Sequence, residues 1–254
     1  RKMPRMEFTR QTRQKIENVG YMETLESDNG TDLYIYGDIV STDADRWCTE
    51  DTCPQSIADF MRTIDTNADI TLHINSGGGD VFAGIGIYNI LQRHAGKITG
   101  MVEGIAASIA SVILMACDTI IIAKGAQLMI HKPLAFAYGN ADDMTKIVEN
   151  LNRCQQMITD IYLTKTCKGV TAEQITDAIN AETWYTAEEA AKVFNVQQDN
   201  TVEALAAYTT EKTVARYKNT PKDLKIQNAE AEEAETAAEK EKNKILEDLF
   251  LYGT

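Results

Sequence analysis

The most regular hydrophobic pattern near the start of the chain is LYIYGDI at 33–39, which follows a DNG turn signal at 28–30. Its alternation of apolar and polar positions indicates a half-buried strand. Residues 41–55 are polar and acidic and are expected to form a loop. Residues 56–64 then repeat apolar side chains three and four positions apart, which predicts a helix.

The segment from 69 to about 135 repeats a simpler unit of strand, turn and helix. We expect strands at 69–75, 97–104, 118–123 and 127–130, a turn at 76–80, and helices at 81–94 and 106–117. Short βα units in series predict an α/β domain with a largely parallel sheet.

A long amphipathic stripe runs along 140–167 and predicts a helix, because its apolar side chains recur three and four positions apart. Two short helices should follow it. Each begins with a capping box, Thr171 with Gln174 and Thr186 with Glu189, in which two side chains satisfy the first backbone N–H groups.

Composition divides the chain into three parts. Residues 1–20 carry six Lys or Arg against two Glu and indicate a basic arm, disordered or docked on a neighbouring subunit. Residues 21–197 contain the regular pattern and are expected to form the folded domain. Residues 198–254 include an acidic, alanine-rich run with almost no apolar stripe, which predicts an exposed helix or a disordered tail.

The formal net charge of −13 argues against a dedicated nucleic-acid binder, because phosphate recognition needs positive charge. No apolar run approaches the roughly 20 residues that span a membrane. The basic start also lacks the apolar centre of a signal peptide. We therefore expect a soluble cytoplasmic protein with no membrane partner. Its five cysteines form no CxxC pair and are expected to be free thiols, with a Cys48–Cys53 bridge as the alternative.

Only three histidines are available as a general base. His73 should point away from the face that Leu72 and Ile74 share on their strand, and a hydrogen-bonded strand residue explains it. His94 ends a helix, where a cation is favoured by the dipole. His131 instead follows a strand and precedes a Lys-Pro pair, a place where polar residues are often functional.

Ser108 is the serine best placed to react. It falls in the first turn of an expected helix, directly after a strand, beside unpaired backbone N–H groups that could stabilise an oxyanion. The alternative is that its small neighbours only allow a helix and a sheet to pack closely. Ser111 lies one turn further along, on the same face.

The glycine-rich turn at 77–79 has a second interpretation, because such turns cradle phosphates at helix starts. However, no lysine follows it, and Asp80 would repel an anion. No histidine or cysteine cluster with metal-ligand spacing is present either. Neither a cofactor nor a metal is expected.

Three separated motifs together resemble one family, the Clp-type caseinolytic serine peptidases (ClpP). HINSGGGDVFAGIGIYNIL at 73–91 resembles their INSPGG-x4-G-x-x-IY segment, GIAASIASVILMA at 104–116 their G-x-A-A-S nucleophile segment, and QLMIHKP at 127–133 their histidine segment R-x-MIHQP. The intervals, 29 residues from Gly79 to Ser108 and 23 from Ser108 to His131, are close to those of the family. A fourth stretch, 171–190, resembles the region of the third triad residue.

The resemblance implies a site made of the nucleophile Ser108, the general base His131, the third triad residue Glu182, and oxyanion N–H groups from Gly79 and Ile109. The family usually has Asp where Glu182 stands, and Asp177 is the alternative acid. Gly77 replaces a customary proline, which loosens the turn, and Ile105 replaces a polar residue.

The fold implied by the resemblance is an α/β, crotonase/ClpP-like ββα spiral whose subunits stack into rings, with 140–167 as the handle helix. The phrases NSGGGDVFAG and ETWYTAEEA resemble the phage or prophage head-maturation branch. The implied function is a serine endopeptidase acting on unfolded chains or on scaffold and capsid precursors. No residue supports docking to an AAA+ unfoldase. The alternatives are a non-catalytic assembly component and a crotonase-type acyl-CoA enzyme.

Overall fold

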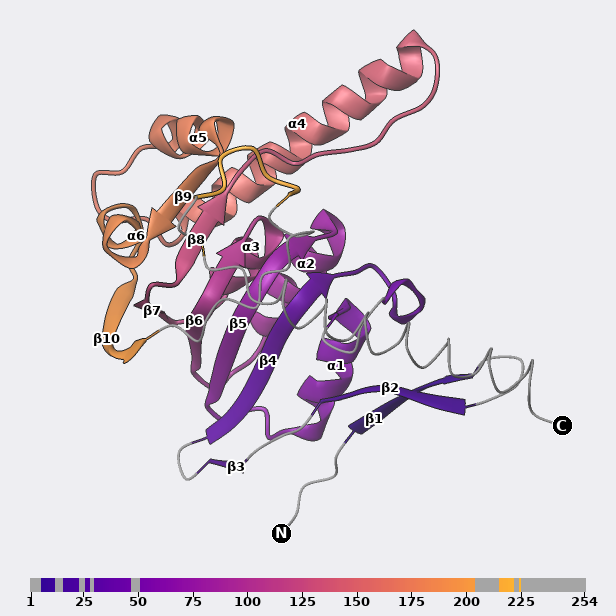
Figure 1. The fold of residues 1–254 in the computed structure, drawn as a ribbon, viewed down its shortest axis with the longest axis vertical. Coiled ribbons are helices and arrows are strands. Elements are labelled where there is room, and N and C mark those ends of the chain that lie inside the picture. The colour runs from indigo at the N-terminus through magenta and orange to yellow at the C-terminus, as the bar shows by residue number, and fades with distance from the viewer. Residues whose placement is uncertain are drawn as a thin grey trace, which may run out of the picture.

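The computed structural model of the chain describes residues 6–11, 16–22, 26–27, 30–46, 51–203, 215–221 and 224. These residues form an α/β domain around a sheet of eight strands, as expected from the βα pattern (Figure 1). The strands of this sheet are β3 (Glu26–Ser27), β4 (Gly30–Ile39), β5 (Ile70–Gly79), β6 (Ile98–Ala107), β7 (Thr119–Lys124), β8 (Gln127–Ile130), β9 (Thr183–Thr186) and β10 (Gln197–Glu203). The helices are the short η1 (Asp43–Asp45), α1 (Pro54–Thr63), α2 (Val81–Leu91), α3 (Ile109–Leu114), α4 (Ala141–Leu163), α5 (Ala172–Ala181) and α6 (Ala187–Val193).

The sheet is largely parallel, with the spatial order β10-β7-β6-β5-β4-β3. On one side strand β6 pairs with β5. On its other side the first half of β6 lies beside β7, and residues 105–107 lie beside β8. Strand β8 in turn pairs antiparallel with β9. Because β6 and β8 are parallel, their carboxyl ends reach the same edge of the sheet, where α/β proteins commonly place functional residues.

The glycines expected to form a turn at 76–80 are part of β5, so that prediction is wrong. The pairing of β5 with β4 continues past Asn75 after a shift in register, until Gly79 lies opposite Ile39. Gly78 has φ +90° and Gly79 φ +154°, backbone conformations that suit glycine. These glycines let the strand run on instead of turning, and α2 begins only after Asp80 caps it through Ala83 N–H at 2.7 Å.

The helix expected at 106–117 is also shorter than predicted. Ala106 and Ala107 belong to β6, and the helix α3 covers only Ile109–Leu114. All its residues are buried, so the uniformly apolar run carries no periodic signal to separate the strand from the helix. The helix expected at 81–94 likewise ends early, at Leu91.

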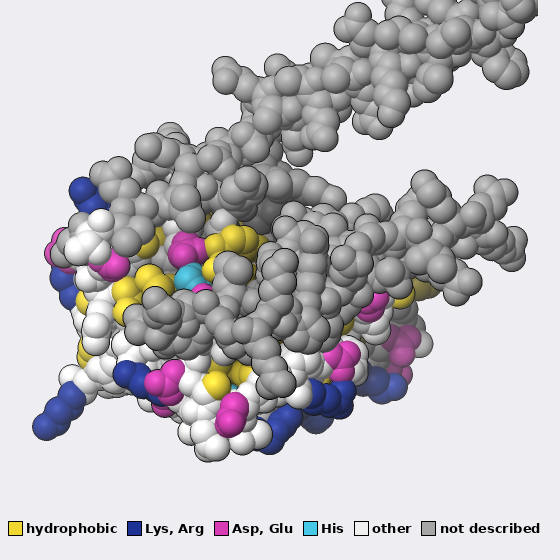
Figure 2. Space-filling view, turned by 90° about the horizontal axis from the view of Figure 1, so that it is seen from below, with side chains coloured by type: hydrophobic (Ala, Val, Ile, Leu, Met, Phe, Trp, Pro, Cys, Tyr) yellow, Lys and Arg dark blue, Asp and Glu magenta, His cyan; other side chains and the backbone are white. Residues whose placement is uncertain are grey.

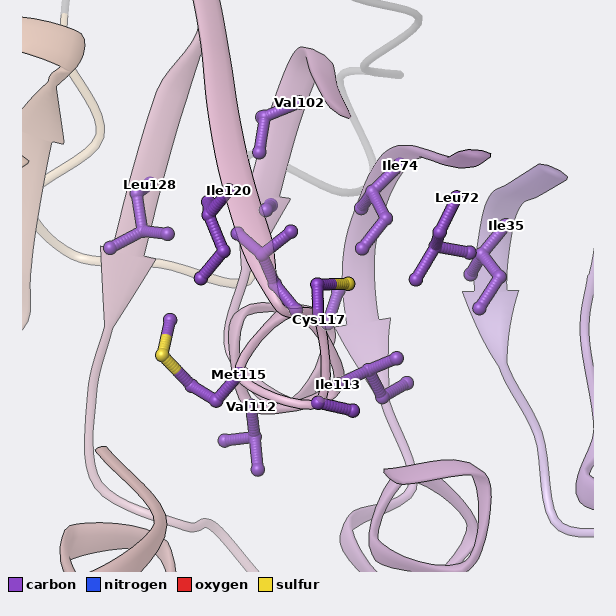
Figure 3. Packing of buried hydrophobic residues seen from close by; sticks show 14 of the residues in the cluster. Ile35, Leu72, Ile74, Val102, Val112, Ile113, Met115, Cys117, Ile120 and Leu128 are labelled. Atoms are coloured by element: carbon purple, nitrogen blue, oxygen red, sulfur yellow. The ribbon is translucent and has the colours of Figure 1, made fainter. Parts of the chain in front are cut away.

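The hydrophobic core lies between the sheet and its covering helices, and α3 is central to it. Figure 3 looks along α3 and shows Ile113 and Met115 packed among Ile74, Val102 and Leu128 of the sheet. Helix α2 packs against α3 through a close contact, since a Cβ on Gly84 would lie 2.1 Å from Ile109 Cγ1. The core therefore holds the start of α3 firmly in place.

Helix α4 spans most of the predicted range 140–167, and Figure 1 shows its amino-terminal half projecting away from the sheet. Only the second half is anchored, through Cys154, Ile158, Thr159 and Tyr162. The two expected capping boxes are present at α5 and α6, with Thr171 and Thr186 as the N-caps. Between these helices, however, the residues ETWYT include the strand β9, which the pattern does not predict.

The outer parts of the chain contain strands that the composition does not predict. Within the expected basic arm 1–20, β1 (Met6–Gln11) pairs antiparallel with β2 (Ile16–Met22). Strand β10 crosses the expected boundary at 197 and pairs with β7. The acidic run 229–248 lies outside the described residues, as does Cys48, while Cys53, Cys117, Cys154 and Cys167 are free thiols.

The charge distribution and the helix hydropathy of the described residues relate to the expected absence of nucleic-acid and membrane partners. On the face shown in Figure 2, the Lys and Arg side chains are interspersed with Asp and Glu. None of the helices in the described ranges has the length and hydropathy needed to cross a bilayer.

Candidate active site

Ser108 occupies a sharp turn between strand β6 and helix α3. Its backbone has φ 56° and ψ −126°, a conformation that residues other than glycine rarely adopt. A strained strand-to-helix turn of this kind presents a nucleophile at the edge of a sheet. Gly78 makes room for it, because a Cβ there would lie 2.7 Å from the carbonyl oxygen of Ala107 and 2.8 Å from Ser108 Cβ.

His131 meets Ser108 because the two residues follow neighbouring parallel strands. Ala107 at the end of β6 pairs with Met129 in β8, and the Ser108 N–H donates to the Met129 carbonyl at 2.9 Å. His131 comes one residue after β8 ends. Its Nε2 lies 2.7 Å from Ser108 Oγ, the geometry of a hydrogen bond between a nucleophile and its base.

Ser111, the second serine of the segment, has a different environment. It is fully buried, and its Oγ lies 2.6 Å from the Ser108 carbonyl oxygen and 3.0 Å from that of Met129. The hydroxyl of Tyr162, in α4, is 2.6 Å away on another side. This network holds the backbone of the turn and of β8 together, so Ser111 supports Ser108 from beneath and does not itself face a substrate.

The His131 imidazole is largely buried, and this burial lowers its pKa below the usual 6.5. The negative charge of Glu182 opposes the shift without cancelling it. A lowered pKa keeps the imidazole neutral near pH 7, and only the neutral form can accept the proton of Ser108.

Glu182 lies close to His131 but bonds elsewhere. It ends α5 with φ 53°, and the next residue, Thr183, pairs with Ile130 immediately before His131. No hydrogen bond joins the Glu182 carboxylate to His131 in the described part of the chain. Instead, Glu182 Oε1 accepts the Asn219 N–H at 2.6 Å. Asp177, the alternative acid, is exposed on α5.

The two predicted oxyanion donors differ in their position relative to the turn at Ser108. Ile109 is the first residue of α3, where the backbone N–H has no partner inside the helix. Gly79 packs against Ile39, since a Cβ there would lie 2.0 Å from the Ile39 carbonyl oxygen. Its neighbour Gly78 lies nearer the turn, with its Cβ position 3.1 Å from the Ile109 nitrogen.

The segment 215–221, with Leu224, also reaches this site, and the sequence motifs do not predict it. Tyr217 lies with its ring edge-on to His131, the ring centroids 5.2 Å apart. Arg216 forms an ion pair with Asp38 at the end of β4. No motif or periodic pattern marks these residues, because they come more than eighty positions after His131 and only the folded chain brings them back.

The other histidines lie away from Ser108. His73 Nδ1 is 2.8 Å from Glu103 Oε1, and its Nε2 is 3.3 Å from Asp32 Oδ1. Burial alone would lower the pKa of His73, but these carboxylates outweigh it and raise the pKa. His94 Nε2 lies 2.7 Å from the Ala68 carbonyl oxygen. The contacts of His73 fit the hydrogen-bonded strand residue expected at its position. His94 does not end a helix as expected, because α2 ends at Leu91.

A serine in a strained strand-to-helix turn, bonded to a histidine, is the arrangement found in the Ser-His class of hydrolases. Comparison with known proteins narrows this class. A model of the Clp protease family matches residues 39–194, and the chain belongs to that family.

Similar proteins include three Clp proteolytic subunits. The ATP-dependent Clp protease proteolytic subunit of Bacteroides fragilis is 30% identical over 138 residues, 52% of this chain and 63% of that protein. The ATP-dependent Clp protease proteolytic subunit 3 of Rhodococcus jostii is 30% identical over 162 residues, which are 62% of this chain and 75% of that protein. The proteolytic subunit 2 of Tropheryma whipplei is 34% identical over 133 residues, which are 52% of this chain and 73% of that protein. The chain thus spans less than two thirds of the first of these relatives.

Proposed function

We propose that this protein is a serine endopeptidase that hydrolyses peptide bonds in unfolded or assembly-precursor proteins. The observation that carries the proposal is the 2.7 Å contact between Ser108 Oγ and His131 Nε2 at a strained turn. Family membership supports it, because the matched range 39–194 contains both residues. A crotonase-type acyl-CoA enzyme would not need this Ser-His contact.

The proposed mechanism is acyl transfer. His131 Nε2 takes the proton of Ser108 as Oγ attacks a peptide carbonyl, and returns it to the departing amine. Backbone N–H groups at Gly79 and Ile109 stabilise the oxyanion, a contribution worth roughly 10²–10³ in rate per donor. Water, activated by His131, then releases the acyl group from Ser108.

Glu182 is proposed as the third member, orienting His131 through Nδ1. In the structure Glu182 Oε1 accepts the Asn219 N–H, and the carboxylate keeps further acceptor positions, so this role requires it to turn toward Nδ1. The register of β8 and β9 supports the assignment, because Ile130 opposite Thr183 leaves His131 and Glu182 as the next facing positions. Asp177 has no comparable placement.

We further propose a ring-forming homo-oligomer in which α4 contacts other copies. The segment before α4 and its first half expose Leu134, Phe136, Tyr138 and Val148, an apolar surface that a second copy would cover. The proposed substrates, from the resemblance to phage and prophage head-maturation proteases, are scaffold or capsid precursors, and the proposed location is the bacterial cytoplasm or phage assembly site. No described residue supports an AAA+ partner.

Covalent labelling tests the activity directly. A fluorophosphonate probe phosphonylates a serine only when a base activates it, so wild-type protein should be labelled and peptide mapping should locate the probe on Ser108. Ser108→Ala should abolish labelling, whereas in Ser111→Ala the probe should still be found on Ser108. Labelling on Ser111, or none on any variant of a folded protein, would contradict the proposal and favour a non-catalytic assembly component.

A further inference from the structure

A segment far along the chain covers the candidate active site. Residues 215–221 and 224, here called the strap, lie over Ser108, His131 and Glu182, and Figure 1 shows the strap beside β9. We propose that the strap is an intramolecular inhibitor, which must leave before a peptide substrate can reach Ser108. This inference rests on the proposed function and adds a form of regulation to it.

Tyr217 fills the centre of the site. Its ring lies edge-on to His131 and to Trp184, with centroids 5.2 Å and 5.8 Å away. Its hydroxyl donates to the Gly77 carbonyl oxygen, and the nearby Ser108 side chain acts to lower the pKa of Tyr217. Burial raises the pKa of Tyr217 to about 12, so the hydroxyl stays protonated and able to donate. A peptide carbonyl attacked by Ser108 would need the space that this ring occupies.

Arg216 fastens the strap on one side of Tyr217. Its two terminal nitrogens bind the two oxygens of Asp38, at 2.9 Å and 2.5 Å. This paired geometry fixes the direction of a guanidinium group better than a single contact does. The pair is about one third exposed on each side, so it contributes only modestly to stability and can open.

Asn219 connects the strap to the acid of the site. Its N–H donates to Glu182 Oε1 at 2.6 Å, and its side-chain amide donates to the Ala181 carbonyl at 2.8 Å. While these bonds persist, the Glu182 carboxylate is engaged with the strap. Removing the strap therefore opens the site and also releases the Glu182 oxygen that the Asn219 N–H occupies.

Leu224 holds the strap on its other side. It is 9% exposed and packs in a small apolar cluster with Ile105, Ala107 and Met129, with Trp184 and Tyr217 against it. This cluster lies directly below the turn that presents Ser108. An ion pair, an amide contact and an apolar contact thus surround Tyr217, which is more than a chance approach of a loose segment would provide.

The strap presents a side chain to Ser108. The group near the serine is the Tyr217 hydroxyl, which cannot be hydrolysed.

The test measures the rate of fluorophosphonate labelling at Ser108 in the full chain. Tyr217→Ala removes the covering ring, and Arg216→Ala loosens the strap from a half-exposed position where folding is not at risk. Lys218→Ala is the matched control, because this side chain is exposed on the same segment. Hydrogen exchange of the peptide that contains Asn219 reports separately whether the strap has been released.

Tyr217→Ala should be labelled about tenfold faster or more, since a closed state of this kind leaves an open population of about 10% or less. Arg216→Ala should be labelled about two- to fivefold faster, because a partly exposed ion pair contributes no more than about 1 kcal/mol. Exchange at Asn219 should rise in both variants, and Lys218→Ala should behave as wild type. If exchange rises while labelling does not, the strap does not inhibit and only this inference is overturned. If no variant is labelled at all, the proposed function fails, and the inference fails with it.

Discussion

Ser108 and Ser111 show how differently the fold treats two serines three positions apart. Ser108 sits in the turn, with φ 56° and its Oγ on His131. Ser111 is fully buried and bonded to the Ser108 and Met129 carbonyl oxygens. The sequence places both on one helix face, but the helix starts only after Ser108. That one boundary decides which hydroxyl can reach a substrate.

At the residue scale, the environment of His131 predicts the pH dependence of labelling. Burial lowers the pKa of His131, so the imidazole is neutral at pH 7, and the rate should fall only as pH drops through the lowered pKa, below about 6.5. Glu182→Gln removes the opposing charge and should move this midpoint to still lower pH. The measurement is the rate of fluorophosphonate labelling against pH, and a midpoint above 6.5 would contradict it.

The same shift has a consequence for stability. Because the pKa of His131 is lower in the folded protein, falling pH protonates this imidazole in the unfolded chain before it does so in the folded one. The contribution of His131 to stability is therefore fully present above the unfolded pKa of about 6.5 and is lost as pH falls through the folded value.

At the element scale, the packing of α2 on α3 positions the start of α3. Gly84 and Gly86 lie two residues apart in α2 and face different surroundings. A Cβ on Gly84 would lie 2.1 Å from Ile109 Cγ1, next to Ser108, whereas a Cβ on Gly86 would meet only Pro54 at 3.5 Å. Alanine substitutions at Gly84 and Gly86 change helix propensity alike, so a difference between them reports the effect of packing.

Gly84→Ala should lower the free energy of unfolding by about 1–3 kcal/mol, because the core beside Ile109 is overpacked. It should also slow labelling of Ser108 by displacing α3. Gly86→Ala should be neutral or stabilising by up to about 1 kcal/mol, since alanine favours the helix. Urea unfolding and labelling rates measure both effects, and equal behaviour of the two variants would refute the packing argument.

The strands around the site show where element prediction works and where it fails. Strands with alternating or β-branched runs, such as LYIYGDI and TIIIA, lie close to where the pattern predicts them. Two failures come at 76–79 and 106–107, where small residues, mostly glycine and alanine, carry no periodic side-chain signal, and a third is β9. Pairing with neighbouring strands, and not local preference, makes these residues strands.

At the scale of the whole molecule, α4 has an apolar stripe longer than the domain can cover. Its second half packs on the core, whereas Val148 in the first half is exposed, together with Leu134, Phe136 and Tyr138 before it. Exposed apolar side chains that gather in one region are typical of interaction sites. The proposed occupant is another copy of the chain.

Val148→Asp should therefore reduce the size of the oligomer, because a charge at a buried interface is costly to desolvate. Lys146→Glu, an exposed change on another face of the same helix, is the control and should leave the size unchanged. Light scattering coupled to gel filtration measures the mass. The same mass for wild type and Val148→Asp would contradict a role for this face.

The sequence alone determined the α/β class, the central strands β4 to β8, the helices α1 to α6 apart from their exact ends, the capping boxes and the two residues Ser108 and His131 as candidates. It could do so because these features depend on local periodicity and on motifs at regular spacing. The contact between Ser108 and His131, the position of Glu182 beside them and the strap over the site depended on the tertiary structure. Each of these joins segments whose meeting is decided by strand order and packing, and no local pattern carries that information.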